Sequence, residues 1–257
     1  MHSKKTAWTI FLTSLASLLA FASLQPKPCS AASCPELTLI QEKIWTAFAG
    51  RNVVAKAVEP SPVSGLCQVH VVVNEKNQIL YTDTSGRYLL LGQVLDAQDK
   101  KNLTQARLDE FNRLTAKDKE VLDGLVAFTL GPETAPKMVY FVTDPQCPYC
   151  RQAETTLEAM TSEGVLQVRY VLYPLPIHPG ARESCIALIC DKKGHEDFKK
   201  NYKSDNQCPE GTNKVDAAMK FMQAHGISGT PTYIFADGTF RSGVMDRTAL
   251  EKKLKAQ

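Results

Sequence analysis

The sequence lacks the features that mark several classes of protein. It has no internal repeat and no low-complexity tract, which excludes a repeat array and a fibrous or disordered chain. None of its five histidines forms an HxxxH pair, and no second CxxC motif accompanies the single one present. We therefore expect no metal site, because a structural zinc needs four ligands. With 44% hydrophobic residues, the chain can bury one large core or two small ones.

Long apolar runs are also missing, apart from one near the N-terminus. The uncharged run over residues 7–22 has 16 residues, fewer than the roughly 20 that a membrane-spanning helix needs. Two lysines precede it, and small residues follow at 20–22 and again at 30–32. This pattern predicts a cleaved export signal over residues 1–32. A lipoprotein signal ending before Cys34 is the weaker alternative, because Ala31 stands where a lipidation motif usually has Leu.

The positive charge belongs to the same segment. Three of the 30 basic residues and none of the 27 acidic ones lie in residues 1–32. Without this segment the bases and acids balance at 27 each, and no long basic run is left. The apparent basicity of the chain is therefore no footprint of nucleic-acid binding, and we expect no nucleic acid as a partner.

Cysteine is well represented, with eight residues. Export would place them in an oxidising compartment, where disulfides persist. Cleavage after Ala32 would leave seven, and an odd count in an exported protein indicates at least one free or exchanging thiol. The positions are Cys29, Cys34, Cys67, Cys147, Cys150, Cys185, Cys190 and Cys208.

The first half of the chain has the pattern of a small α+β domain. An amphipathic helix is predicted over residues 36–48, and four short strand-like runs separated by turn residues follow it. Cys67 shares one face of the second run with Val69 and Val71, so we expect it to be a core residue first and a reactive thiol second. The predicted strands are 53–58, 67–73, 78–82 and 88–92.

The second half changes to an α/β pattern. Apolar residues at helical spacing predict one long connecting helix over residues 103–128. A buried strand at 138–142, a helix at 148–162 and a strand at 168–172 then form a βαβ unit with a parallel pair. Asp237-Gly238 predicts a tight hairpin turn near the C-terminus. Further helices are predicted near 181–191, 196–202, 214–225 and 247–255.

The chemistry of the chain centres on Cys147-Pro148-Tyr149-Cys150, which follows the buried strand and opens a helix. A helix N-terminus offers free backbone N–H groups and a positive dipole end, and both stabilise a thiolate. Cys147 is therefore the predicted nucleophile, and Cys150 is placed to resolve the mixed disulfide that it forms. The alternatives are half of a zinc site and a plain structural disulfide, and the strand–CxxC–helix context favours redox chemistry.

A second motif, Thr230-Pro231-Thr232, precedes the strand that enters the hairpin. By itself a Thr-Pro pair predicts only a loop. Together, residues 141–150 (FVTDPQCPYC) and 226–235 (GISGTPTYIF) resemble the periplasmic disulfide isomerases of the DsbC/DsbG group. The segment 62–65 with the strands after it resembles the N-terminal dimerisation domain of that family, and residues 102–104 resemble the start of its linker helix.

The resemblance implies an architecture. It divides the chain into a signal peptide (1–32), an α+β N-terminal dimerisation domain (33–100), a helical linker (101–131) and an α/β thioredoxin-like catalytic domain with a helical insertion (132–257). It also implies a homodimer, and a membrane-bound reductase of the DsbD type that keeps the cysteine pair reduced. Misfolded or reduced periplasmic proteins would be the substrates, and no cofactor is expected.

The resemblance also implies roles for individual residues. Pro231 would be a cis-proline facing the Cys147–Cys150 pair, with Thr230 lending its backbone to a substrate strand. Cys190 and Cys208 would form a structural disulfide. Independently of the resemblance, we expect Tyr149 to be partly exposed beside Cys147 and to contact unfolded substrate.

Some positions depart from the family pattern or are open. Pro148 matches the DsbG-type dipeptide rather than the DsbC type, which has Gly, and this leaves the substrate range open. Cys185 is an extra thiol that we expect to be buried and inert. Cys29 and Cys34 have no clear counterpart, although a retained Cys34 could pair with Cys67.

Two polar residues near the motif have competing interpretations. We interpret His178 as a loop residue rather than part of the site. Asp144 either tunes a thiol or caps the turn before the helix. The sequence thus predicts a disulfide isomerase or reductase. A dithiol oxidase on the same scaffold, a holdase chaperone and a glutaredoxin-like activity are the alternatives.

Overall fold

The computed structural model describes residues 33–49, 52–74 and 76–255 of the chain. The predicted export signal at 1–32 lies outside the described residues. Within them, no helix combines the length and the apolar character needed to cross a membrane.

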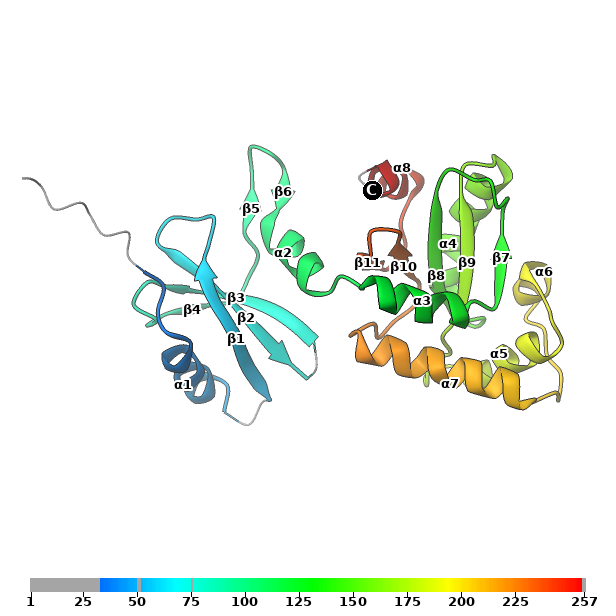
Figure 1. Ribbon diagram of the computed structural model, residues 1–257, viewed down its shortest axis with the longest axis horizontal. Coiled ribbons are helices and arrows are strands. Elements are labelled where there is room, and N and C mark those ends of the chain that lie inside the picture. Colours follow the sequence, from blue (N-terminus) through cyan, green and yellow to red (C-terminus); the bar gives the residue numbers. More distant parts are fainter. Residues whose placement is uncertain (1–32, 50–51, 75, 256–257) are drawn as a thin grey trace, which may run out of the picture. The chain divides into compact units, whose positions relative to one another are not determined.

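The N-terminal domain is a helix packed on a four-stranded antiparallel sheet (Figure 1). Ile40 and Ile44 from the helix are buried against Val69 and Val71 of the second strand. This confirms the predicted helix and the run of short strands, since alternate side chains of the sheet face one helix. The elements are α1 (Leu37–Ala47), β1 (Val53–Pro60), β2 (Leu66–Val73), β3 (Lys76–Asp83) and β4 (Leu89–Leu90).

A disulfide closes the start of this domain. Cys34 and Cys67 are bonded, with a sequence separation of 33 residues. Cys67 is fully buried on the face of β2 that packs against α1. The bond therefore fixes the segment before α1 to the start of β2, one of the two inner strands of the sheet.

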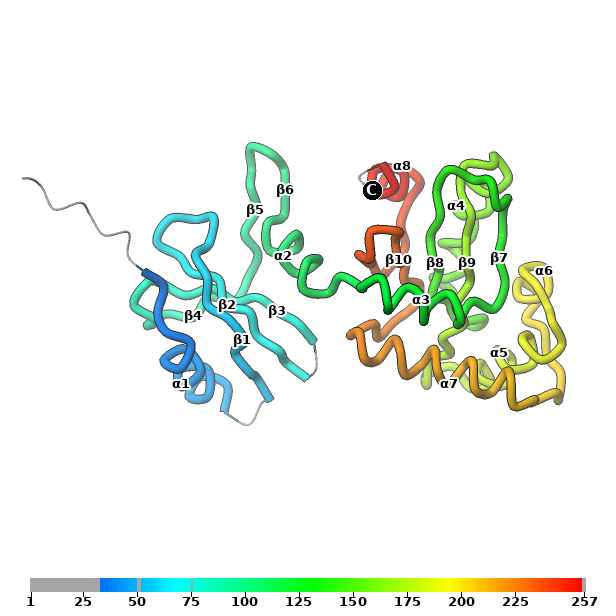
Figure 2. Tube along the Cα trace, in the orientation of Figure 1, coloured from blue at the N-terminus to red at the C-terminus, as the bar shows by residue number. Residues whose placement is uncertain are grey.

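The predicted long connecting helix is wrong, because the chain forms two helices here. They are α2 (Leu103–Phe111) and α3 (Ala116–Leu125), after a short ribbon of β5 (Leu95–Asp96) and β6 (Lys101–Asn102). Thr115 caps α3 in a capping box with Asp118, and a cap of this kind starts a new helix. Figure 2 follows the chain through the break between α2 and α3.

The sequence after α3 is also not helical. Phe128 begins β7 (Phe128–Leu130), which pairs antiparallel with β9, and its ring stacks on Tyr170 with centroids 4.6 Å apart. Phe128, which extended the helical pattern in the sequence, therefore belongs to an edge strand of the five-stranded C-terminal sheet. Tertiary packing has overridden the periodicity here.

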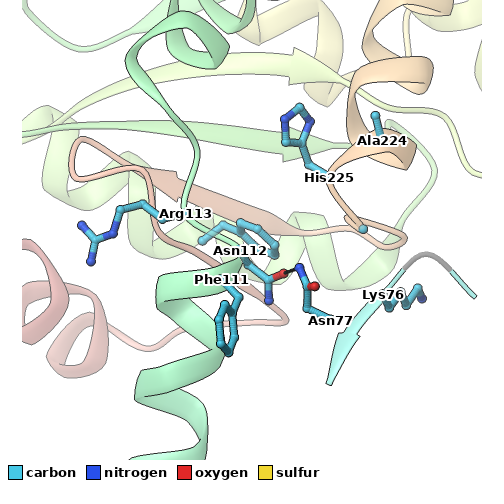
Figure 3. A pocket seen from close by; sticks show the side chains of 9 residues that line it. Lys76, Asn77, Phe111, Asn112, Arg113, Ala224 and His225 are labelled. Carbon is cyan, nitrogen blue, oxygen red and sulfur yellow. Dashed lines mark hydrogen bonds between the residues drawn. The ribbon is translucent and has the colours of Figure 1, made fainter. Parts of the chain in front are cut away.

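Helix α2 ends against the N-terminal sheet. The ring of His70 stacks on Phe111 with centroids 3.8 Å apart, and its Nε2 lies 2.7 Å from Oδ1 of Asn77. The amide of Asn77 in turn donates to Oδ1 of Asn112, at 2.8 Å, as the dashed line in Figure 3 shows. These polar contacts fix the end of α2 on β2 and β3.

The C-terminal domain is built on a five-stranded sheet with the order β11-β10-β8-β9-β7. Only β8 and β9 are parallel, and α4 connects them, which confirms the predicted βαβ unit. The hairpin at Asp237-Gly238 joins β10 to β11 as predicted. The strands are β8 (Met138–Thr143), β9 (Gln167–Leu172), β10 (Thr232–Phe235) and β11 (Phe240–Ser242).

Helices cover both faces of this sheet. Val139 and Phe141 of β8 point into a core shared with α4, α5 and α8, and the alternate residues Tyr140 and Val142 face α3 and α7. Helices α3 and α7 lie side by side on the face of the sheet that they cover (Figure 1). The helices are α4 (Pro148–Ser162), α5 (Ala181–Cys190), α6 (His195–Lys199), α7 (Pro209–Ala224) and α8 (Arg247–Lys255).

A second disulfide joins the helices inserted after β9. Cys190 at the end of α5 bonds to Cys208, which caps the start of α7. Gly211 makes the close approach possible, since a Cβ there would lie 2.6 Å from Sγ of Cys190. The bond thereby closes the segment between α5 and α7, which contains α6, into a loop.

The Cys34–Cys67 bond should stabilise the N-terminal domain. Replacing both residues by Ala is expected to lower the free energy of unfolding by about 3–4 kcal/mol, because a loop of this length is no longer closed in the unfolded chain. Urea unfolding followed by circular dichroism would measure this. The exposed Val63→Ala variant serves as the control, and an unchanged midpoint in the double variant would contradict the expectation.

Candidate active site

The CxxC motif sits at the junction of β8 and α4. Strand β8 ends at Thr143, a short turn follows, and Cys147 is the N-cap of α4. The backbone N–H of Cys147 donates to the carbonyl of Asp144 at 3.1 Å, and Pro148 occupies the first turn, where no N–H is needed. The thiol of Cys147 therefore lies at the positive end of a 15-residue helix.

The second motif lies against the first. The Thr230–Pro231 peptide bond is cis, and the Sγ of Cys147 lies 3.6 Å from the carbonyl oxygen of Thr230. The two segments meet because β10 pairs with β8, with Thr232 opposite Val142. Residues that are 83 positions apart in the chain are thus brought into contact by one pair of neighbouring strands.

The two thiols differ in their surroundings. Both are buried, and Cys150 is the less exposed, at 1%. Burial raises the pKa of Cys150 to about 12, although the hydroxyls of Thr143 and Thr230 act in the opposite direction. Tyr149 between them is 63% exposed, so its ring lies on the surface next to the pair.

Asp144 holds the turn that carries Cys147. Its carboxylate is 1% exposed, and its Oδ1 accepts a hydrogen bond from the N–H of Gln146 at 2.7 Å. Its Oδ2 accepts from the N–H of Leu175 at 2.6 Å and lies 2.8 Å from Nδ1 of His178. The contacts confirm that Asp144 caps the turn, and they also link the turn to the loop after β9.

His178 lies in the loop after β9, as interpreted from the sequence, and its ring also contacts the turn before the CxxC motif. Its Nδ1 lies 2.8 Å from Oδ2 of Asp144, three residues before Cys147. Gln146 adds a further link, because its amide donates to the carbonyl of Pro179 at 2.9 Å. The proximity of this loop to the motif follows from the parallel pairing of β8 and β9, whose C-terminal ends meet at one edge of the sheet.

Cys185 is fully buried in α5, as predicted from its place in the helix. Burial raises the pKa of its thiol well above the ordinary value, and the negative charges of Asp144 and Glu183 act in the same direction. Among the described residues no cluster of His, Cys, Asp or Glu has the arrangement of a metal site.

Comparison with known proteins agrees with this arrangement along the chain. The family described as thioredoxin-like domain matches residues 127–257, just over half of the chain, and the disulfide bond isomerase protein N-terminal domain matches residues 26–105. The chain belongs to the DsbC/DsbG family of thiol:disulfide interchange proteins. The resemblance seen in the sequence is confirmed, and the reaction is thiol–disulfide exchange.

Relatives in this family align over most of their length. A probable DsbC of Bordetella parapertussis is 27% identical over 86% of this chain and 75% of its own. DsbC of Dickeya dadantii is 27% identical over 72% of this chain and 74% of its own. DsbG of Pseudomonas aeruginosa is 24% identical over 79% of this chain and 80% of its own. Both branches of the family are thus similar to this chain.

Sequence reasoning missed part of the site. It did not single out Glu154 or Thr143. Both side chains are buried, and both residues lie within four positions of Cys147 or Cys150 in the sequence. For Glu154 a signal was present, since it follows Cys150 by four residues and so shares its helix face. For Thr143 the signal was its position as the last residue of the buried strand.

The different surroundings of the thiols predict selective alkylation. In the reduced enzyme at about pH 8, iodoacetamide should modify Cys147 and leave Cys150 and Cys185 unmodified, because a thiol reacts only as thiolate. Modification of Cys150 should increase as the pH rises toward its pKa of about 12. Mass spectrometry of peptides would locate the label, with Cys147→Ser as the control. Labelling of Cys150 ahead of Cys147 would contradict the assignment.

The Asp144 contacts predict a large effect of a small substitution. Asp144→Asn replaces one acceptor oxygen by an NH₂ group that faces donors, so the free energy of unfolding should fall by about 2–4 kcal/mol. The exposed, ion-paired Asp216→Asn is the control and should change it by about 0.5 kcal/mol or less. Urea unfolding measures both variants, and equal midpoints would show that Asp144 does not hold the turn.

Proposed function

We propose that the protein is an exported disulfide isomerase that uses Cys147 as its nucleophile and Cys150 as its resolving thiol. The observation that carries the proposal is the contact of the Cys147 thiol, at a helix start, with the backbone of the cis Thr230–Pro231 segment. The match of residues 26–105 to the disulfide isomerase N-terminal domain supports isomerisation over simple oxidation.

The reaction begins with the thiolate of Cys147. It attacks one sulfur of a wrong substrate disulfide, a mixed disulfide forms, and the other substrate sulfur leaves as a thiolate. A second substrate thiol then displaces Cys147, which completes an isomerisation with no net change in oxidation state. Attack by Cys150 instead closes the Cys147–Cys150 disulfide and leaves the substrate reduced by two electrons.

The surroundings of the pair suit an extended substrate segment. The backbone of Thr230, beside Pro231, would pair with the substrate strand and present its disulfide to Cys147. Tyr149, exposed next to the nucleophile, would pack against apolar side chains of an unfolded chain. Cys190–Cys208 would serve as a structural bond, because it lies away from the motif between α5 and α7.

Each segment of the chain would have its own role. In this proposal residues 33–100 form the homodimer interface, 101–131 the linker and 132–257 the catalytic domain. A cleaved signal over 1–32 would deliver the protein to the periplasm, where misfolded proteins are substrates. A membrane-bound reductase of the DsbD type would keep Cys147 reduced.

A dithiol oxidase is the second candidate. Pro148 in the spacer bears on this candidate, since the residues between the two cysteines influence the redox potential of the pair. The two candidates differ in the oxidation state in which the Cys147–Cys150 pair is active. The isomerase acts from the free thiols, and the oxidase acts from the disulfide.

Refolding of a protein with scrambled disulfides tests the proposal. Residues 33–257, with a low concentration of a thiol reductant, should restore substrate activity, and Cys147→Ser should abolish the effect. Cys150→Ser should retain a substantial part of it, because a substrate thiol can resolve the mixed disulfide. Rapid oxidation of a reduced substrate without reshuffling would identify an oxidase. Suppression of aggregation by a Cys147→Ser/Cys150→Ser variant, with no exchange by the wild type, would identify a holdase.

A further inference from the structure

Two buried hydroxyl groups near Cys150 are left without a hydrogen-bond partner. Oγ1 of Thr143 and Oγ1 of Thr230 make no hydrogen bond to any of the described residues. A buried hydroxyl in this state has given up its bonds to water and gained none in the protein, which costs folding free energy. Such groups are uncommon in native structures, so each one needs a physical explanation.

The alternation of side chains along β8 determines where Thr143 lies. Phe141 faces the core that contains Cys150, whereas Val142 faces the core on the opposite side of the sheet. Thr143, the last residue of the strand, is therefore on the same face as Phe141. Its side chain is fully buried, and its carbonyl accepts a hydrogen bond from the N–H of Tyr173 at 2.8 Å. The backbone of Thr143 is thus held by the neighbouring chain, and only its hydroxyl is left over.

Three donors converge on the sulfur of Cys150. Burial is the largest effect and raises the pKa of this thiol to about 12, while the hydroxyls of Thr143 and Thr230 and the backbone N–H of Asp144 lower it. A donor lowers the pKa of a thiol when it stabilises the thiolate. A neutral thiol is only a weak acceptor, which is consistent with the absence of a complete hydrogen bond to either hydroxyl in the thiol form. The donors are therefore arranged for a charged sulfur.

Thr82 shows that an unpaired hydroxyl alone does not make a site. It is fully buried on β3 of the N-terminal domain, and its hydroxyl also has no partner in the part of the chain that the structure describes. It lies opposite Cys67, whose sulfur is already bonded to Cys34. Thr143 differs because the sulfur beside it is a free thiol that has to pass through its charged form.

The charge on Cys150 develops when the disulfide of the enzyme opens. A thiolate from outside bonds to Sγ of Cys147, the Cys147–Cys150 bond breaks, and its electron pair goes to Sγ of Cys150. Cys150 then takes up the proton that the outside thiol has lost to solvent. Resolution of a mixed disulfide by Cys150 is the same step in reverse. In both directions the charge forms on a residue that is 1% exposed, where protein donors must replace water.

We propose that Thr143 is a catalytic residue whose hydroxyl, with that of Thr230 and the N–H of Asp144, binds the Cys150 sulfur while the Cys147–Cys150 disulfide opens or closes. This deepens the proposed function and rests on the roles given there to the two cysteines. Strand β8 fixes Thr143 before the reaction, so its donor needs no rearrangement when the charge appears. The hydroxyl that lacks a partner in the thiol form gains one in the transition state.

This role has a kinetic signature that packing does not share. Cys150 is neutral both in the disulfide and, at neutral pH, as a thiol, so its charge exists only between the two states. Loss of the Thr143 hydroxyl should therefore slow opening and closing by the same factor and leave the equilibrium between them unchanged. Thr143→Val makes this test, because Val keeps the branched shape and replaces the hydroxyl by a methyl group.

A two-step thiol assay measures the closing reaction. When the reduced enzyme reacts with 5,5′-dithiobis(2-nitrobenzoate), Cys147 releases the first aromatic thiolate, and closure of the disulfide by Cys150 releases the second. In Thr143→Val the second release should be about tenfold slower at about pH 7, and the first should change by less than about twofold. Thr143→Ser keeps the hydroxyl and should stay within about threefold of the wild type in the second release. The matched control Thr82→Val should leave both steps unchanged.

Reduction of the oxidised enzyme by dithiothreitol measures the opening reaction. Its rate in Thr143→Val should fall by about the same tenfold factor, because it crosses the same transition state. The equilibrium constant with the glutathione couple should change by less than about twofold.

Each outcome decides for or against the proposal. An unchanged second release in Thr143→Val overturns it, and so does a slowing of both releases by one factor or an equal loss in Thr143→Ser. A shift of the glutathione equilibrium by the factor of the rate loss also overturns it, because Thr143 would then stabilise one oxidation state. If Thr143→Val does not fold, Thr143→Ala carries the same test, and unfolding of both overturns the proposal. Absence of the first release in the wild type would overturn the proposed function of Cys147, which the other outcomes leave standing.

Discussion

The pairing of β10 with β8 is the constraint on which the rest of the site depends. It sets Thr232 opposite Val142, and this register places the cis Thr230–Pro231 bond over the start of α4. A shift by one residue would turn the faces of β10 over and remove the Thr230 carbonyl from Cys147. The side chains of β10 are all buried, so both cores of the domain specify the register together.

A second set of contacts fixes the other edge of the motif. Asp144 uses both carboxylate oxygens to hold its own turn and the loop after β9. Cys147 is therefore held in place by two strands and a loop from three separate parts of the chain. Such a site is rigid where the sulfur must be presented, and exposed only around Tyr149.

Much of this could be predicted from the sequence, for a physical reason. The CxxC motif, the buried strand before it and the Asp237-Gly238 turn are local patterns, and local patterns determine local structure. The family resemblance supplied what is not local, including the juxtaposition of Thr230 with Cys147. The break at Asn112–Thr115 was missed, because the capping box of Thr115 and Asp118 competes with a helical apolar pattern that continues across it. Glu154 and His195 were missed because they are far apart in sequence and meet only after α6 packs on α4.

The order of the cysteines has a consequence for how the protein itself matures. In the described chain Cys34 pairs with the next cysteine, Cys67, and Cys190 pairs with the next one, Cys208. A chain that emerges from a membrane pore and is oxidised as it appears joins successive cysteines first. The Cys34–Cys67 bond would then form without any rearrangement, whereas Cys190 has the free Cys185 before it and must pass it over to reach Cys208.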